Sequence, residues 1–567
     1  MDQIQDFAED RLSFRHAKES RLKIKVNGKP MTVRMYEAVY VKNPTNVAMV
    51  PTQGQPDQML SIYVPEGASD RSPIIFFVKN HGWIVNSYAL RHRVEDGKEY
   101  SGSSDRDLIG KAMADGYVLV TYGCRSRGDH PDAEGRYVSH APATITDTKA
   151  VIRYLRYNRD LLPAGDTEHI IVTGTSGGGA LSTIIGASGN NEEFYPSLYE
   201  IGAAGMEMQE GHLASTLRDD VYAVIAYCPI QDMREADAAY EYTYYPIRKR
   251  LVEEGLPVVD PQTGFTFQDP FSETYTPEWM LEAGVKLTAQ YETYIDHLGL
   301  ADAQGDAITG ANLRDKMREL INLSLAKAYR EIGIDRMLAD LAGQAEYSDR
   351  KTTEHFHIGS ENWKDFFSYD ENGCPYLADT SALMDYLYFV ARNQTLKVAC
   401  AFSNRGLTEN GLATVSGFCE DSLYGTTEQA RSPFEFYSWE KDAGFIDGCG
   451  LQNTGLSFEE FLGTEAGRTL QSQLYMTGPI HYLLEEPSIL TEHTHSDIAP
   501  CWYVRHGLRD RDTSFAVQTV LYHALRQNRD IQTLNFALAW LQPHCGDYDV
   551  NEAYTWLAEC MNKYPAR

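Results

Sequence analysis

Hydrophobic and polar positions follow two different patterns in the first 230 residues of the chain. Near the start they alternate, which is typical of strands with one buried and one exposed face. Further on the apolar residues form short uninterrupted runs, which favour strands covered on both faces, as in a parallel sheet. The alternating segments are 22–26, 31–41 and 59–64, and the uninterrupted runs are 73–80, 115–122, 170–172 and 221–230.

A helical spacing separates these runs. Between 144 and 162 the apolar residues lie close to one stripe, and Asp147 puts an acidic group near the predicted N-terminus, where it suits the helix dipole. Because strands and helices alternate from about 73 to 230, we expect a parallel, doubly wound sheet. The stripe residues are Ala150, Ile152, Tyr154 and Leu155.

The pattern changes after Ile230. From about 236 to 490 the chain is charged and mostly helical, with clear helical spacing at 277–295 and 310–333. Strands alternating with helices resume afterwards, so the helical block is best explained as an insertion that splits one sheet. We predict a first part of the sheet domain over 1–232, an inserted lid over 233–490, and a second part over 491–567. The later strands are 501–506 and 535–542, and the later helices are 513–527 and a final one that contains Trp556.

Composition limits the kinds of binding partner and the cellular compartment that we expect for this protein. The 567 residues are 43% hydrophobic, enough for a substantial core, and the net charge of −29 argues against nucleic acid and anionic membrane surfaces. The nine cysteines are scattered and form no C-x-x-C pair, so we expect reduced thiols. The acidic segment 1–14 lacks the apolar region of a signal peptide, and no run is apolar enough to span a bilayer. We therefore expect a cytoplasmic protein; the oligomeric state stays open.

The strongest chemical motif follows the apolar run at 170–172. Gly174-Thr175-Ser176-Gly177-Gly178 has the spacing G-x-S-x-G, and the residues after it are helical. Strand, tight turn and helix are the context in which this motif presents a nucleophilic serine. A glycine-rich turn with an incidental serine would explain the pentapeptide alone, but not its context.

A serine hydroxyl is a poor nucleophile until a base, usually a histidine oriented by an acid, takes its proton. In the α/β-hydrolase arrangement the chain order is serine, acid, histidine, with the histidine after the last strand. Of sixteen histidines, only His544 directly follows the predicted final strand. Asp510 and Asp512 both follow the strand at 501–506, and spacing does not decide between them; either could instead cap the next helix.

Two His-x-His pairs suggest metal binding but lack support. Neither pair has a carboxylate or cysteine at a recognised ligand spacing, so we expect no metal. No phosphate-binding glycine loop is recognisable, and we expect no cofactor. The pairs are His355/His357 and His493/His495.

The tripeptide His81-Gly82-Trp83 directly follows the strand at 73–80. A loop in this position of a hydrolase fold supplies a backbone N–H to an oxyanion. From the tripeptide alone, an ordinary turn is the preferred interpretation.

Two C-terminal motifs are specific in combination: RHGLRDRDTSFA at 505–516 and FALAW-x-x-PHCGDYD at 536–549. They resemble segments of the bacterial tannases, the tannin acyl hydrolases. The resemblance covers both halves of the predicted sheet domain and little of the lid. Further matching segments lie at 141–158, 174–182, 186–190, 226–230 and 236–241.

The resemblance implies an α/β-hydrolase with a large lid inserted after the strand that ends at Pro229-Ile230. Ser176 would be the nucleophile, His544 the base and Asp510 the orienting acid. The oxyanion donors would be the backbone N–H groups of Gly177 and Trp83.

The resemblance also implies a set of contacts to a galloyl ring. Asp512, Lys397 and Glu420 would each contact a ring hydroxyl, and Ile230 would pack on the ring face. Cys419 stands where the family has a proline on the opposite face, so the second wall of the ring slot is left open. A fungal and feruloyl-esterase group joins cysteines beside the serine and the histidine; here Thr175 precedes Ser176, although Cys545 follows His544.

We therefore expect a serine esterase that hydrolyses galloyl esters, as small-molecule substrates, to gallic acid and an alcohol through an acyl-enzyme. A carboxylesterase for feruloyl or other hydroxycinnamoyl esters is a close alternative. A non-catalytic phenol-binding protein with the same fold is a second. A peptidase of this fold is less favoured, because no β-propeller repeat is present.

Overall fold

The structure is a computed structural model of the whole chain. It describes residues 11–48, 55–78, 83, 94–127, 130–254, 277–346, 366–391, 396–397, 399–403, 420–442, 455–485, 495–544, 546 and 548–566.

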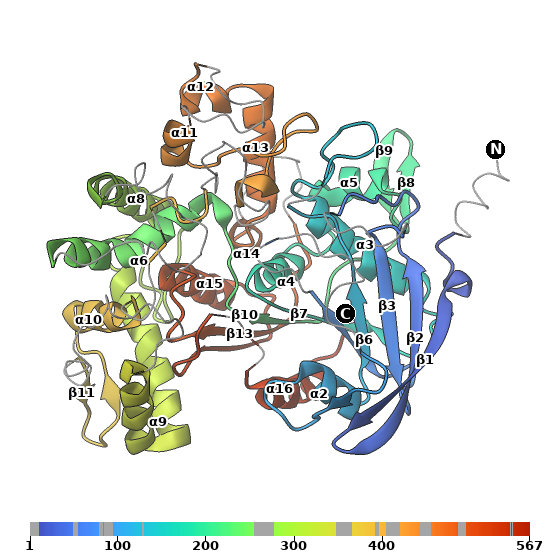
Figure 1. Cartoon of the computed structure of the whole chain (residues 1–567), viewed down its shortest axis with the longest axis horizontal. Helices are drawn as coiled ribbons and strands as arrows, with labels where there is room; N and C mark the ends of the chain where they lie inside the picture. The colour runs from blue at the N-terminus through green and yellow to red at the C-terminus, as the bar shows by residue number, and fades with distance from the viewer. Residues whose placement is uncertain are drawn as a thin grey trace.

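A ten-stranded sheet forms the centre of the described part of the chain (Figure 1). Its strand order is β14-β13-β10-β7-β4-β6-β3-β2-β1-β5, and all neighbours from β14 to β6 are parallel. The strands β1, β2 and β3 pair antiparallel at the other side, as the alternating pattern predicts. The bounds are β1 Lys18–Val26, β2 Lys29–Val39, β3 Met59–Pro65, β4 Pro73–Phe77, β5 Glu99–Tyr100, β6 Val118–Tyr122, β7 Asp166–Thr175, β10 Ala223–Tyr227, β13 Cys501–Gly507 and β14 Thr533–Ala539.

Two layers of helices cover the two faces of the sheet. Successive residues of the buried strands point to opposite faces, so Ile170 and Val172 enter one hydrophobic cluster while Ile171 enters the other. The first face packs against α3 (Ala143–Tyr157), α4 (Gly177–Ala187) and α15 (Phe515–Gln527). The second packs against α2 (Leu108–Ala114) and α16 (Val550–Lys563), which lie together (Figure 1). This is the α/β-hydrolase fold that the sequence predicts, and the prediction of fold class is confirmed.

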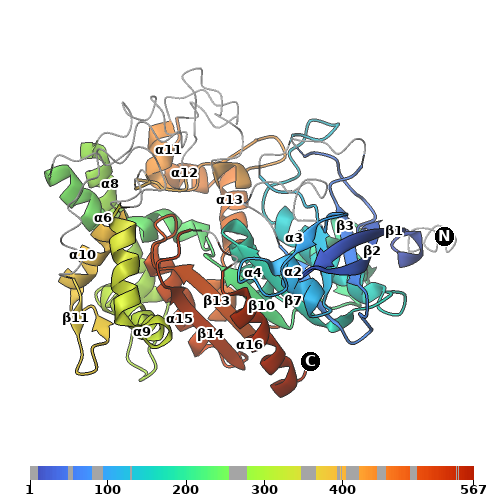
Figure 2. The same ribbon diagram turned by 60° about the horizontal axis from the view of Figure 1, so that its bottom comes forward.

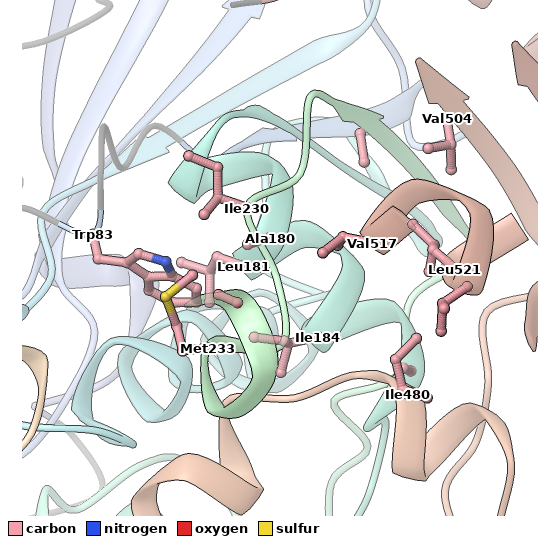
Figure 3. Packing of buried hydrophobic residues seen from close by; sticks show 14 of the residues in the cluster. Trp83, Ala180, Leu181, Ile184, Ile230, Met233, Ile480, Val504, Val517 and Leu521 are labelled. Atoms are coloured by element: carbon pink, nitrogen blue, oxygen red, sulfur yellow. The ribbon is translucent and has the colours of Figure 1, made fainter. Parts of the chain in front are cut away.

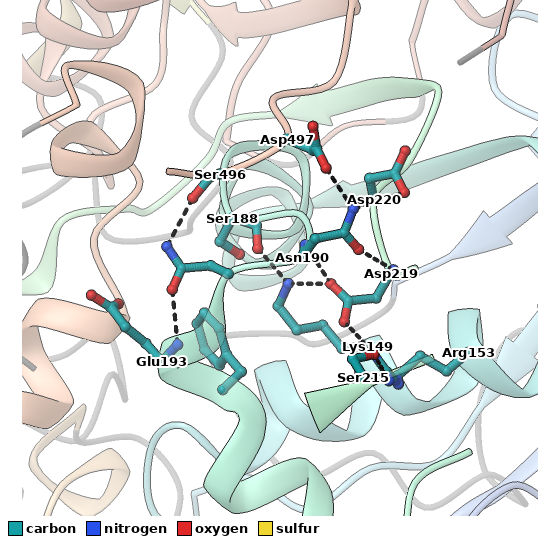
Figure 4. Close-up of polar contacts among 12 residues, drawn as sticks. Lys149, Arg153, Ser188, Asn190, Glu193, Ser215, Asp219, Asp220, Ser496 and Asp497 are labelled. Carbon is teal, nitrogen blue, oxygen red and sulfur yellow. Dashed lines mark hydrogen bonds and ion pairs between the residues drawn. The ribbon is translucent and has the colours of Figure 1, made fainter. Parts of the chain in front are cut away.

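Helix α3 is buried all round rather than along one stripe. Its charged side chains are therefore paired inside the protein: Lys149 and Arg153 both bind Asp219, at 2.8 Å (Figure 4). Asp147 does not lie in the first turn, contrary to the sequence prediction, and its carboxylate binds Arg125 at 2.8 Å. The local pattern could not show this, because the partners lie 22 to 70 residues away in the chain.

The strands β10 and β13 are neighbours, with Ala223 paired to Cys501. The chain between them forms mainly helices beside the sheet, and α9 packs along β14 and α15 (Figure 2). This arrangement agrees with an insertion; the limits of 1–232, 233–490 and 491–567 stay predictions. The helices are α6 Met233–Glu253, α8 Pro277–His297, α9 Leu313–Glu346, α10 Thr380–Ala391, α11 Phe436–Asp442, α12 Phe458–Leu462, α13 Glu465–Met476 and α14 Ile480–Leu483.

Small elements complete the fold. The 3₁₀ segments are Phe14–His16, Glu192–Phe194 and Glu420–Leu423, the short helix α5 is Tyr195–Glu200, and two hairpins pair β8 (Met206–Gln209) with β9 (His212–Ser215) and β11 (Ser368–Tyr369) with β12 (Pro375–Tyr376). Within the described ranges, every helix is too short or too polar to cross a bilayer. The six described cysteines form no disulfide with one another: Cys124, Cys228, Cys374, Cys400, Cys501 and Cys560.

Candidate active site

Ser176 alone forms the turn between β7, which ends at Thr175, and α4, which begins at Gly177. Its backbone has φ 58° and ψ −122°, a conformation that L-residues rarely adopt and that the surrounding structure has to enforce. Gly174 is required because a Cβ there would lie 2.4 Å from the carbonyl oxygens of Val78 and Gly178. The turn holds Ser176 at the N-terminus of α4, in the strand–turn–helix context that the sequence predicts.

A line of hydrogen bonds joins Ser176, His544 and Asp510. The Nε2 atom of His544 lies 2.9 Å from Ser176 Oγ, and its Nδ1 atom lies 2.8 Å from Asp510 Oδ2. The Asp510 side chain is fully buried, whereas 14% of the His544 side chain is exposed. The structure thus brings together three residues from the ends of β7, β13 and β14, and only the serine–histidine end of the line reaches the surface.

The pKa shifts of Asp510 and His544 suit a histidine that acts as a general base. Burial favours a neutral carboxyl, but the rings of His544 and His506 hold the pKa of Asp510 below its usual range. Burial also favours a neutral imidazole, but the Asp510 carboxylate raises the pKa of His544 well above its usual value. Asp510 is therefore an anion that increases the affinity of His544 for a proton.

Structure decides between the two candidate acids. Asp510 Oδ1 accepts the backbone N–H groups of Asp512 and Thr513, at 2.8 and 3.3 Å, which leaves Oδ2 for His544. Neither aspartate caps α15, because Ser514 does so by accepting the N–H of Ala516. The hydroxyl of Tyr244, on α6, donates to the Asp510 carbonyl at 3.2 Å and ties the acid to the inserted segment.

The two predicted oxyanion donors have different backbone settings. Gly177 is the first residue of α4, where backbone N–H groups have no partner within the helix. Trp83 has φ 61°, its side chain is fully buried, and its carbonyl accepts a hydrogen bond from the Ser126 hydroxyl. Its ring packs in one cluster with Ile230 and Leu181 (Figure 3). The role of both N–H groups stays a prediction.

Ile230 lies beside the serine. Its backbone N–H donates to the Ser176 carbonyl at 3.3 Å, and its side chain is 6% exposed. Its backbone therefore contacts the serine turn, and the packing of its side chain on a ring stays a prediction.

The predicted polar contacts come from both the sheet domain and the inserted segment. Asp512 lies 3.1 Å from Arg511; burial would raise the pKa of Asp512, but Arg511, His544 and Lys397 hold it below its usual range. Asp512 therefore shares one electrostatic environment with His544 and Lys397.

The other two side chains have partners of their own. The Lys397 ammonium lies 4.2 Å from the centre of the Phe402 ring. Glu420, on the 3₁₀ turn Glu420–Leu423, is buried against Arg127 at 3.3 Å. The Arg127 guanidinium compensates a carboxylate that would be costly to bury alone.

Two residues near the site make contacts that the sequence does not predict. The Thr175 hydroxyl accepts the backbone N–H of Gly546 at 2.6 Å, which links the serine turn to the histidine loop. His506 is fully buried, with Nδ1 3.3 Å from Asp510 Oδ2. Thr175 occupies an x position of the G-x-S-x-G motif, so the motif does not predict its contact with Gly546. His506 precedes Asp510 by four residues in RHGLRD, and only its position in β13 could have indicated that it lies near the acid.

Several sequence predictions lie outside the described residues. These are Cys419 and Cys545, the loop residues His81 and Gly82, and the histidines His355, His357 and His493.

A serine at the turn after β7, with an acid and a histidine after two later parallel strands, defines the α/β-hydrolase class. A family model described as BD-FAE matches residues 60–253. No curated protein matches the chain.

Solved structures resemble the chain along nearly its whole length. A tannase from Fusobacterium nucleatum is 25% identical, with 97% of this chain and 99% of that chain covered and a TM-score of 0.66. A tannin acyl hydrolase from Lactobacillus plantarum is 26% identical, with 97% and 98% covered and a TM-score of 0.64. A tannin acyl hydrolase in complex with ethyl gallate is 27% identical, with 97% and 99% covered and a TM-score of 0.65. The predicted resemblance to bacterial tannases is confirmed, and the chain is an enzyme of the carboxylic ester hydrolase class.

Proposed function

We propose that the enzyme is a serine esterase that hydrolyses galloyl esters to gallic acid and an alcohol through an acyl-enzyme. The observation that carries the proposal is the hydrogen-bonded line from Ser176 through His544 to Asp510 at the carboxyl ends of parallel strands. The likeness to tannin acyl hydrolases, one of them in complex with ethyl gallate, supports the choice of acyl group.

The first step is attack by Ser176 on the ester carbonyl. His544 Nε2, 2.9 Å from Ser176 Oγ, takes the hydroxyl proton as the new C–O bond forms. Asp510 keeps the other ring proton on Nδ1 and stabilises the imidazolium that results. The strained turn contributes by holding the hydroxyl away from the sheet, so little reorganisation is needed.

The second step is collapse of the tetrahedral intermediate. The N–H groups of Gly177 and Trp83 would bind the oxyanion, and each such donor contributes about 3–4 kcal/mol in comparable sites. His544 returns the proton to the leaving alcohol, and the acyl group stays on Ser176. Water, deprotonated by the same histidine, then releases the acid.

Ring recognition follows from the charges around the site. Two carboxylates, Asp512 and Glu420, can accept hydrogen bonds from phenolic hydroxyls, and the Lys397 ammonium can donate one. Ile230 offers an apolar surface to the ring face. A ring without these hydroxyls would displace water from these groups without offering them hydrogen bonds in return, which makes the site selective against it.

An ester panel tests the proposal. We expect methyl gallate to exceed methyl benzoate and methyl ferulate in kcat/KM by about 10² or more, because a site built for hydroxyls rejects analogues that lack them. Glu420→Gln and Lys397→Met should lower kcat/KM for methyl gallate and so reduce its ratio to kcat/KM for methyl benzoate. Faster turnover of methyl ferulate would replace the galloyl assignment with a hydroxycinnamoyl esterase. No turnover of any ester, with gallate still bound, would favour a phenol-binding protein.

A further inference from the structure

The acid–histidine pair of the site has a thiol beside it. Cys228 follows β10, and one ligand atom from each of Cys228, Asp510 and His544 lies within 4.8 Å of the others. The Cys228 backbone is held by its own N–H, which donates to the Arg505 carbonyl at 2.7 Å, and its side chain is fully buried. This thiol has no part in the proposed ester hydrolysis.

A second buried histidine lies beside the Asp510 carboxylate of this group. His506 Nδ1 lies 3.3 Å from Asp510 Oδ2, the oxygen that also faces His544. Within the described residues, neither ring nitrogen of His506 has a hydrogen-bond partner, although the side chain is fully buried. A buried imidazole without hydrogen bonds is unfavourable, and a metal ion is one of the groups that would satisfy it.

We propose that Cys228, His544 and Asp510, with His506 beside them, form an inhibitory site for a thiophilic divalent cation such as Zn²⁺ or Cd²⁺. A sulfur, an imidazole nitrogen and a carboxylate oxygen are the donor set that such ions prefer. Magnesium and calcium prefer oxygen ligands only and would not bind here.

The charge balance favours this class of ion. On binding, the Cys228 thiol loses its proton, so that one thiolate and the Asp510 carboxylate together neutralise a divalent cation. The ion would enter past His544, the exposed end of the group, where 14% of the side chain reaches solvent.

Inhibition follows from the two nitrogens of His544. Nδ1 faces Asp510, so the cation takes Nδ1 and the ring proton moves to Nε2. Nε2 then donates to Ser176 Oγ instead of accepting from it, and the serine cannot lose its proton to this base. The cation therefore stops the reaction without touching the substrate pocket.

Direct binding tests the site without any need for esterase activity. Ser176→Ala protein is titrated with CdCl₂ and followed by the ultraviolet charge-transfer absorbance of a cadmium–thiolate bond. We expect one equivalent of Cd²⁺ to bind, with loss of that signal in the added Cys228→Ala change and no loss in a matched Cys374→Ala change. Cys228→Ser, which keeps the side-chain volume, serves if the alanine variant unfolds. A signal unchanged in both Cys228 variants would overturn the proposal.

Inhibition tests the consequence, and this arm alone depends on the proposed function. ZnCl₂ should inhibit methyl gallate hydrolysis reversibly, with recovery on EDTA, and MgCl₂ should not. Cys228→Ala should weaken the inhibition by about tenfold or more, since one of three ligands is lost, while Cys374→Ala behaves as the wild type. CdCl₂ should inhibit in the same way, and full activity at CdCl₂ concentrations that saturate the binding signal would contradict the inhibitory role.

Discussion

Helix α4 has a cluster of buried polar side chains at each end, and the two clusters differ in how completely they are satisfied. At the C-terminal end, Lys149 donates to the Ser188 carbonyl and to Asp219, and Arg153 binds the other oxygen of Asp219 (Figure 4). The side chains of all three charged residues are 0–1% exposed. At the N-terminal end, Ser176 and His544 form a single line of bonds that opens to solvent.

The difference indicates what each cluster does. Asp219 has cations on both oxygens, and Lys149 complements the negative end of the α4 dipole, so this network has no capacity left for a ligand. Ser176 lies at the positive end of the same dipole, where negative charge is favoured. A saturated cluster stabilises the fold, whereas the open one is available for chemistry.

The largest expected effect on activity comes from removing the Ser176 hydroxyl. Ser176→Ala should lower kcat for methyl gallate by about 10⁴–10⁶-fold, because no nucleophile remains, with little change in the melting temperature. Ser182→Ala, in the same helix, is the matched control and should stay active. Substantial turnover by Ser176→Ala in steady-state assays would show that another group is the nucleophile.

Asp510→Asn should lower kcat by about 10⁴-fold, because the histidine loses its orienting anion. The pH profile provides a second readout. Protonated His544 cannot accept the serine proton, so activity falls as the pH drops through the pKa of His544, which Asp510 raises. The acid limb of kcat/KM in Asp510→Asn should therefore shift to lower pH. An unshifted limb would mean that Asp510 does not set the pKa of His544.

Breaking the saturated cluster should affect stability instead. Asp219→Ala leaves Lys149 and Arg153 buried without an anion, which should cost about 3–5 kcal/mol of unfolding free energy. Urea unfolding followed by circular dichroism measures the loss. Glu134→Gln, at an exposed pair with Arg136, should change nothing measurable. If Asp219→Ala is as stable as wild type but less active, the distinction between the two clusters fails.

The smallest effect is expected at the link between the serine turn and the histidine loop. Thr175→Val removes the acceptor of the Gly546 N–H and should lower kcat by about tenfold, with KM nearly unchanged, because one hydrogen bond that positions His544 is lost. Thr175→Ser restores the acceptor and should recover the activity. Equal loss in both variants would assign the effect to side-chain volume.

Much of the fold was open to prediction because it depends on local patterns. Uninterrupted apolar runs located β4, β6, β7 and β10, and the motif around Ser176 located the turn into α4. The helix predicted at 310–333 was shorter than α9, since the chain resumes a helix after Gly333, whose φ is 73°. A glycine predicts an end to a helix, but only packing decides whether helical structure continues beyond it.

The sequence by itself determined where the strands lie, where the serine turn falls, and which histidine follows the last strand, because spacing along the chain encodes all three. Spacing left Asp510 and Asp512 open, and only the family resemblance favoured Asp510; the tertiary structure shows that Asp510 faces His544, that α3 is buried on every side, and that Thr175 contacts Gly546. These outcomes depend on side chains that are distant in the chain and meet only once the sheet has formed, so no local pattern predicts them.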